Sequence, residues 1–321
     1  MSKVIAKKGA RSPGINKKTW KEDLRKNWIV YVMFLLPFTF LFVFNYMPMA
    51  WLAMAFEDFS FRKGILGSDW VGFANFARLF SLDQFWLAFR NTVCMALINL
   101  VFGFFFPLVL ALLLSEVRVK WFRRGVQTIS FLPYFISTVV VCMMFKLFLD
   151  KDGIITELLV AIFHITPQNL LTNGDIPVFW LINAFIEVWQ KTGYSSIMFV
   201  AVLSNIDNSI MEAAAIDGAN RWDRLVKIKL PAIMPFVLTM LTLNVGLIFM
   251  QGFDKILLLY NSDIYSVADC MQTFTYRYSF TGAKPDYALS TAAGLFQSVI
   301  ATVLMLISNY MQAGLQKKNA A

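Results

Sequence analysis

Six long apolar stretches dominate the pattern along the chain. They cover residues 29–51, 93–114, 126–149, 178–203, 231–253 and 289–311. A helix needs about 20 mainly apolar residues to cross a hydrocarbon core about 30 Å thick. The charged residues inside these stretches are only Lys146, Glu187 and Lys191. The pattern therefore predicts an all-α, polytopic membrane protein with six transmembrane helices.

Composition supports this interpretation and excludes several classes of protein. Of the 321 residues, 58% are hydrophobic and 15% are charged, whereas soluble domains have about 45–50% apolar and about 25% charged residues. Three widely separated cysteines and one histidine argue against a disulfide framework, a structural zinc site or a histidine-based catalytic triad. A metal site within this chain is therefore not expected.

The positive charges predict an orientation in the membrane. The net charge is +9, and 19 Lys and Arg fall in residues 1–28, 115–125, 204–230 and the tail after 311. The alternate segments 52–90, 150–177 and 254–288 hold 8. We expect the protein to lie in the plasma membrane of the cell. Because cytoplasmic loops carry the excess of Lys and Arg, we expect both of its termini in the cytoplasm. Charges spread over short loops are not the single basic face of a nucleic-acid-binding protein.

These assignments divide the chain into consecutive segments. We expect a basic cytoplasmic tail at 1–28, a first transmembrane helix at 29–51 and an extracytoplasmic segment at 52–90. A membrane core follows at 91–313, with a cytoplasmic loop at 204–230, and a second cytoplasmic tail covers 314–321.

The cytoplasmic loop 204–230 has an unusual local pattern. Its alanine-rich turn is a good helix former and follows Asn208 or Ser209, either of which can cap a helix. Gly218 then allows a positive φ and a bend. A second amphipathic helix is predicted from 221 to 229, ending at Leu230-Pro231. The two helices would form a projection with small side chains at its corner.

The residues of this loop resemble a known motif. Their spacing is similar to that of the EAA loop in permease subunits of ATP-binding-cassette importers. The matching positions are Glu212-Ala213-Ala214, then Gly218 after three residues, Ile228 after nine more, and Leu230-Pro231 after one more. Residues 215–219, Ala-Ile-Asp-Gly-Ala, are typical of carbohydrate importers. Segments 51–56, 67–72 and 111–116 also resemble the subgroup that imports oligosaccharides and complex-glycan fragments. Thr138 stands where that subgroup usually has Trp, so the resemblance does not specify one sugar.

The resemblance implies a type I importer fold and a set of partners. These would be a second homologous permease, two cytoplasmic ATPases and an extracytoplasmic sugar-binding protein. The chain has no Gly-x4-Gly-Lys-[Ser/Thr] phosphate loop, so ATP and Mg²⁺ would bind the ATPases and this chain would carry no cofactor. The positions expected to contact the ATPase are Glu212, Ala213, Ala214, Asp217, Gly218, Ala219, Arg221, Leu230 and Pro231.

Polar side chains within the apolar stretches predict a translocation pathway. In the fourth stretch Glu187, Gln190, Lys191 and Tyr194 share one helical face, and in the fifth Asn244, Ile248 and Gln251 share another. Amide, carboxylate and aromatic groups suit the hydroxyls and C–H faces of an oligosaccharide. The alternative is structural: Glu187 and Lys191 neutralise each other, and the amides join helices.

The sequence does not favour either of two other classes of function, a secondary transporter or a membrane enzyme. A secondary transporter of small polar solutes would be expected to have internal repeats or interrupted helices with ion-binding groups, and no convincing repeat is visible. A membrane enzyme would need clustered catalytic groups, which the single histidine and the scattered cysteines do not supply.

Overall fold

The computed structural model describes residues 20–320 apart from 165, 173–175, 250–251 and 282–283. The α-helices there are α1 (Trp20–Lys26), α2 (Trp28–Leu41), α3 (Gly64–Gly67), α4 (Ala74–Phe80), α5 (Asp83–Glu116), α6 (Lys120–Phe131), α7 (Thr138–Phe148), α8 (Ile154–Phe163), α9 (Ile176–Leu203), α10 (Asn208–Ile216), α11 (Arg221–Arg224), α12 (Leu230–Gly246), α13 (Phe253–Leu259), α14 (Tyr265–Ala268), α15 (Met271–Tyr276) and α16 (Tyr287–Ala320).

Shorter regular elements complete these residues. The 3-10 helices are η2 (Met47–Phe56), η3 (Leu132–Phe135) and η5 (Ser262–Ile264), and the π-helical turns are η1 (Phe42–Tyr46), η4 (Leu225–Lys229) and η6 (Arg277–Thr281). Two strands, β1 (Glu57–Asp58) and β2 (Asp69–Trp70), pair antiparallel with Glu57 opposite Trp70. This small hairpin was not expected from the sequence, because two residues are too few to form an alternating pattern.

The chain forms two compact units, Met1–Leu52 and Ala53–Ala321. In the first unit α2 has no buried side chains. Trp28, Phe34 and Leu36 are each more than half exposed. Such an apolar helix suits a lipid environment, as predicted for the first transmembrane helix.

Four helices are long and apolar enough to cross a membrane, and two bent pairs bring the number to six. The four are Trp28–Phe56, Asp83–Glu116, Arg221–Gly246 and Tyr287–Gly314. Three of them contain the predicted stretches 29–51, 93–114 and 289–311, whereas the helix that begins at Arg221 ends at Gly246, before the predicted end of the stretch 231–253. The second is longer than predicted, because α5 continues in one helix from Asp83 through residues assigned to the extracytoplasmic segment 52–90.

The third predicted stretch, 126–149, is not one straight helix. The helix that ends at Phe135 and α7 meet at 96°, and Ile136 and Ser137 between them are extended. Pro133 lies in the last turn before the break, and its ring removes a backbone donor there. Pro107 nevertheless lies inside an unbroken α5, so proline alone does not determine where a helix breaks.

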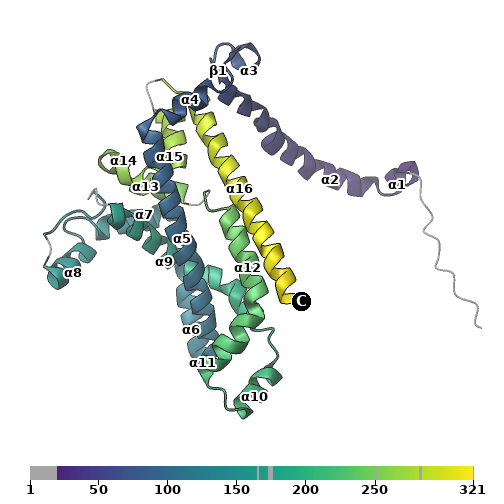
Figure 1. The fold of residues 1–321 in the computed structure, drawn as a ribbon, viewed down its shortest axis with the longest axis vertical. Helices are drawn as coiled ribbons and strands as arrows, with labels where there is room; N and C mark the ends of the chain where they lie inside the picture. The colour runs from purple at the N-terminus through teal and green to yellow at the C-terminus, as the bar shows by residue number, and fades with distance from the viewer. Residues whose placement is uncertain (1–19, 165, 173–175, 250–251, 282–283, 321) are drawn as a thin grey trace, which may run out of the picture. The chain divides into compact units, whose positions relative to one another are not determined.

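The second unit is built around α5, α9, α12 and α16 (Figure 1). α5 packs extensively on α9, and α12 packs along α16. One buried cluster joins α7, α9, α13 and α14, a second joins α5, α15 and α16, and a third joins the ends of α5 and α9 to α12. These contacts hold the helices around the middle of the unit, where the cavity described below lies.

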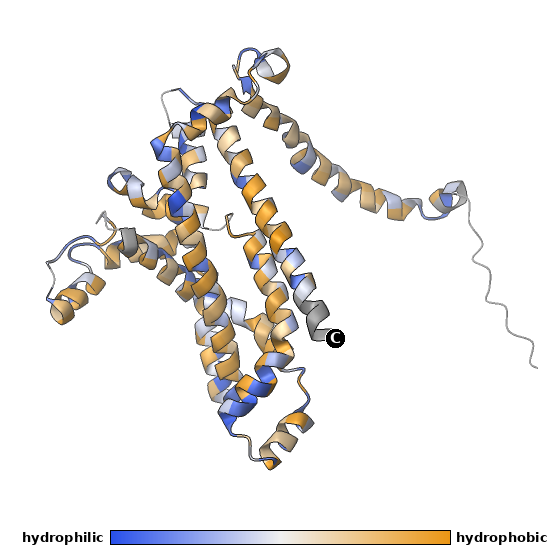
Figure 2. Ribbon diagram, in the orientation of Figure 1, coloured by the Kyte–Doolittle hydropathy of each residue, from blue (hydrophilic) through white to orange (hydrophobic). Residues whose placement is uncertain are grey.

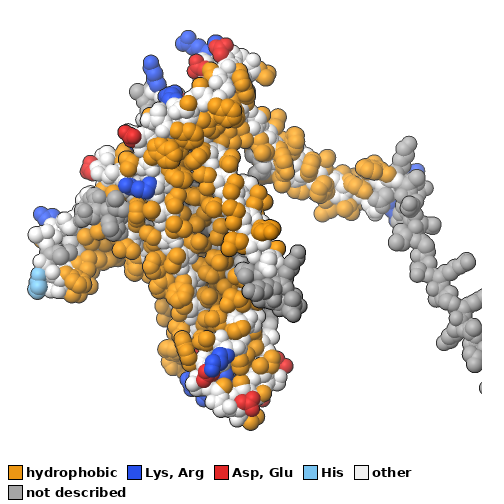
Figure 3. Space-filling view, viewed as in Figure 1, with side chains coloured by type: hydrophobic (Ala, Val, Ile, Leu, Met, Phe, Trp, Pro, Cys, Tyr) orange, Lys and Arg blue, Asp and Glu red, His pale blue; other side chains and the backbone are white. Residues whose placement is uncertain are grey.

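The surface of this unit carries apolar side chains along its helices. Orange residues run the length of α5, α12 and α16 in Figure 2. Figure 3 shows the charged side chains mainly near its two ends and along one side, with few over the central helices. A surface that is apolar in the middle and charged at the ends suits a chain that spans a bilayer.

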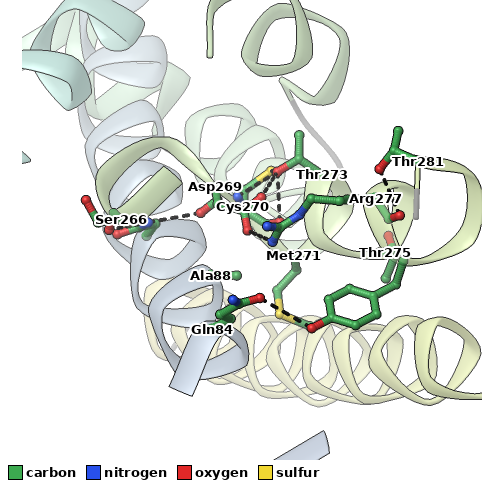
Figure 4. Close-up of polar contacts among 12 residues, drawn as sticks. Gln84, Ala88, Ser266, Asp269, Cys270, Met271, Thr273, Thr275, Arg277 and Thr281 are labelled. Carbon is green, nitrogen blue, oxygen red and sulfur yellow. Dashed lines mark hydrogen bonds and ion pairs between the residues drawn. The ribbon is translucent and has the colours of Figure 1, made fainter. Parts of the chain in front are cut away.

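A polar network holds the segment after α13 against α5 (Figure 4). The Asn91 amide donates to the carbonyl oxygens of Ser266 and Asp269, at 3.1 and 3.0 Å. Asp269 in turn accepts from the Thr273 hydroxyl at 2.7 Å and pairs with Arg277. Asn91 is therefore a packing residue, and the network fixes α14 and α15 beside the start of the membrane core.

Candidate functional site

A cavity of about 530 Å³ lies between α5, α9 and α12. Its walls combine apolar and polar groups in a part of the chain otherwise made of membrane-length helices. The lining residues are Ala96, Asn99, Leu100, Gly103, Tyr134, Glu187, Val188, Lys191, Thr192, Tyr194, Ser195, Asn244, Leu247 and Ile248.

Two buried polar atoms in the cavity wall have no hydrogen-bond partner. They are Oδ1 of Asn99 and Oγ1 of Thr192. A third polar group, the Asn244 amide, donates from Nδ2 to the Met240 carbonyl of its own helix at 2.8 Å. An unpaired buried polar atom costs about 1–3 kcal/mol. Because both unpaired atoms are buried, a ligand in the cavity would reach them only after the surrounding side chains move.

Two tyrosines form a flat aromatic surface at the same cavity. The rings of Tyr134 and Tyr194 lie 3.9 Å apart between centroids and 3° from parallel. Tyr134 comes from η3, directly before the break in the third span, and Tyr194 from α9. The break therefore brings Tyr134 to the cavity, where an aromatic face and a hydroxyl are both available.

Three charged groups meet at one wall. Glu187 binds Lys191 through Oε1 at 2.6 Å and Lys255 through Oε2 at 2.7 Å. The Lys255 ammonium also donates to the Asn183 carbonyl at 2.9 Å. The predicted pair between Glu187 and Lys191 is thus present. Lys255 was not expected here, because the hydropathy pattern assigns it to an extracytoplasmic segment.

Some of the predicted pathway residues line the cavity, and others do not. Glu187, Tyr194, Asn244 and Ile248 line the cavity together. Gln190 does not line it: its buried amide donates to the Ile136 carbonyl at 3.1 Å. That carbonyl stands at the helix break, where the extended backbone interrupts the helical hydrogen bonds. Gln251 lies outside the described residues.

The loop 204–230 begins with a capped helix. α10 is capped by Asp207, not by Asn208 or Ser209 as expected, and its carboxylate accepts from the Ser209 backbone N–H at 2.9 Å. This hydrogen bond lowers the pKa of Asp207. The carboxylate therefore stays ionised at neutral pH and complements the positive end of the helix dipole.

Gly218 forms the predicted corner. Its φ is +82°, and the N–H groups of Gly218 and Ala219 donate to the carbonyls of Ala215 and Ala214, at 3.2 and 2.9 Å. These two bonds make a Schellman motif, in which the residue after the helix end takes the left-handed conformation. Glu212, Ala213, Asp217 and Gly218 are exposed, and no atom lies within 4 Å of a Cβ built at Gly218.

The second helix of the loop does not end at Leu230-Pro231 as predicted. Asn220 caps α11 by accepting from the Asp223 N–H at 2.8 Å, and the helix then continues through η4 into α12 as one element, Arg221–Gly246. Pro231 thus lies inside this element, directly after the π-helical turn η4, where the regular α-helical hydrogen-bond pattern is already interrupted. Asp223 pairs with Lys227 at 2.7 Å, and this hydrogen bond lowers the pKa of Asp223.

A partly buried ion pair connects the loop to the membrane core. The Lys229 ammonium lies 2.5 Å from Glu116 Oε1 and 3.2 Å from the Ser115 carbonyl, at the C-terminal end of α5. A cation there satisfies helix-terminal carbonyls and the negative end of the helix dipole. A displacement of the loop would therefore be transmitted both along α12 and to α5.

Comparison with known proteins identifies the family. The model of the family "Binding-protein-dependent transport system inner membrane component" matches residues 103–319. Protein LplB of Bacillus subtilis is 35% identical over 294 residues, covering 91% of each protein. The polygalacturonan/rhamnogalacturonan transport system permease protein YteP of the same organism is 32% identical, covering 94% of this chain and 95% of YteP.

Solved structures agree with these relatives. A chain of a bacterial ABC transporter that imports the acidic polysaccharide alginate superposes with a TM-score of 0.83 at 34% identity, covering 91% of this chain and 98% of that one. A chain of the bacterial alginate ABC transporter, in complex with its periplasmic protein bound to an alginate pentasaccharide, gives 0.84 at 34% identity, with coverages of 93% and 98%. Family, relatives and fold all indicate a transport subunit and not an enzyme or a secondary transporter. This chain belongs to the binding-protein-dependent transport system inner membrane component family and is a permease subunit of an ATP-binding-cassette importer.

Proposed function

We propose that this permease forms half of the pathway of an ATP-driven oligosaccharide importer. The polar cavity between α5, α9 and α12 carries the proposal. The polar lining residues Asn99, Thr192 and Asn244 and the stacked rings of Tyr134 and Tyr194 suit the hydroxyls and C–H faces of a saccharide. The relatives named for polygalacturonan/rhamnogalacturonan and alginate transport support a saccharide as the substrate.

The partners proposed for this chain follow from the family. They are a second homologous permease, two cytoplasmic ATPases that bind ATP and Mg²⁺, and an extracytoplasmic saccharide-binding protein. Within the described residues, no group of three or more His, Cys, Asp or Glu could hold a metal ion.

The exposed face of α10 and α11 is the proposed contact with one ATPase. Ile216 and Trp222 are 86% and 70% exposed there, beside the open corner at Gly218. Large apolar side chains held in the open on a cytoplasmic loop favour a protein partner. Closure of the ATPases would then move this loop as one body. This movement would switch the cavity between an inward-open and an outward-open state.

Replacing Asn244 by Leu should test the pathway. We expect the rate of oligosaccharide uptake to fall about tenfold, because the loss of one polar partner costs about 1–3 kcal/mol and leaves an apolar wall compatible with the membrane. The measurement is uptake by the reconstituted importer, together with the amount of ATPase that copurifies. Leu243→Ile, an exposed neighbour on α12 outside the cavity, is the matched control. Unchanged uptake by Asn244→Leu would remove this amide from the pathway.

The proposed orientation has both termini in the cytoplasm. Single cysteines at Ser262 and Ser209, both exposed, can be introduced into a chain in which Cys94 is replaced by Ser. An impermeant thiol reagent added to intact cells should label position 262 and not position 209, whereas inverted vesicles should reverse the result. Labelling of position 209 from outside would contradict the orientation.

A further inference from the structure

The charges at the cavity wall do not balance. Two ammonium groups bind one carboxylate, Glu187: Lys191 lines the cavity, whereas Lys255 is buried and is not among the lining residues. No other Asp or Glu is among the described residues that line the cavity. This wall therefore carries one net positive charge at the depth of the membrane-spanning helices.

The two lysines are bound differently. Lys255 is 3% exposed, and its ammonium is held by Glu187 and by the Asn183 carbonyl. The Lys191 side chain is 45% exposed, and its recorded partner is Glu187 Oε1. An ammonium has three donors, so Lys191 keeps donors for a further acceptor in the cavity. The surplus charge is thus at Lys191 and not at the buried Lys255.

An unbalanced charge between membrane helices is costly. The cost is lowered when a counter-charge of opposite sign comes within hydrogen-bond distance. The neutral polar residues that line the cavity, among them Asn99, Thr192 and Asn244, supply no negative charge. A ligand that brings both hydroxyls and an anion would suit these residues together with Lys191.

We propose that Lys191 binds the carboxylate of an acidic saccharide, a uronate residue, as the saccharide passes through this cavity. The proposal deepens the proposed function and rests on it. Glu187, 2.6 Å from Lys191, reduces the net charge of the wall to +1, which matches a singly charged carboxylate. A phosphate dianion would be repelled by Glu187 and only half neutralised.

The test separates charge from shape. A tri-uronate and its fully methyl-esterified form have the same ring skeleton, but only the first is anionic. Both are titrated against the purified permease–ATPase complex without the binding protein, so that only the membrane part discriminates. We expect the wild-type complex to prefer the tri-uronate. Lys191→Gln should weaken tri-uronate binding about tenfold, the factor for one charge-assisted hydrogen bond, and leave binding of the ester unchanged.

Two controls complete the experiment. Lys191→Arg keeps the charge and should retain the preference for the acid. Lys146→Gln removes an exposed lysine of α7 that is not part of the cavity wall and should have no effect. Equal weakening of both ligands in Lys191→Gln, or no weakening, would overturn the proposal. Binding of neither form to the wild-type complex, with no saccharide transported by the full importer, would instead count against the proposed function itself.

Discussion

Gly218→Val should uncouple ATP hydrolysis from uptake while the protein inserts into the membrane at normal levels. Gly218 has a φ of +82°, a conformation that is strained by about 1–3 kcal/mol in other residues and most disfavoured for β-branched ones. Because no atom lies within 4 Å of a Cβ at this position, the strain acts on the corner between α10 and α11 alone. The measurement is saccharide-stimulated ATPase activity of the reconstituted complex, alongside the copurified ATPase.

Two further variants separate the shape of the corner from its bulk. Asn tolerates the left-handed conformation better than other residues, so Gly218→Asn should keep the Schellman turn and lose less coupling than Gly218→Val. Gly314→Val is the control for the bulk of the side chain. It introduces valine at an exposed glycine near the end of α16 that also has open space around it. Normal coupling in Gly218→Val would exclude this corner from the mechanism.

Hydropathy was sufficient to predict the straight membrane helices. The stretches later found in Trp28–Phe56, Asp83–Glu116, Arg221–Gly246 and Tyr287–Gly314 contain about 20 apolar residues each, and no packing detail is needed to recognise them. The corner at Gly218 was predictable for a similar reason, since a glycine directly after an alanine-rich helix is a local signal. Local signals and long apolar runs were the reliable parts of the sequence.

The break in the third span depended on tertiary structure. Ile136 leaves a carbonyl that needs a donor, and Gln190 of α9 supplies it. At Gly193 the approach of α9 is so close that an added Cβ would lie 2.0 Å from the Ser130 carbonyl oxygen. Neither contact can be read from residues 126–149 alone, and Gln190 was therefore assigned to the pathway when its position indicates a structural role.

The charged wall was only half predictable. Glu187 and Lys191 are four residues apart on one helix, so their pairing is visible in the sequence. Lys255 lies 68 residues away from Glu187 along the chain and near the boundary of an apolar stretch, where a lysine is ordinary. The unpaired oxygen of Asn99 likewise becomes visible only when the neighbouring helices are in place.

Replacing Glu187 by Leu should strongly destabilise the permease. The carboxylate accepts from the buried Lys255 and from Lys191, and its loss leaves the Lys255 ammonium buried with the Asn183 carbonyl as its remaining recorded partner. Removing one partner of a buried ion pair typically costs about 3–5 kcal/mol. Lys255→Met should cost less, because Glu187 keeps Lys191. The double variant Glu187→Leu with Lys255→Met should recover much of the loss, since it removes both buried charges. The measurement is thermal unfolding of the purified complex in detergent. A double variant no more stable than Glu187→Leu would show that a stranded Lys255 charge is not the cause of the destabilisation.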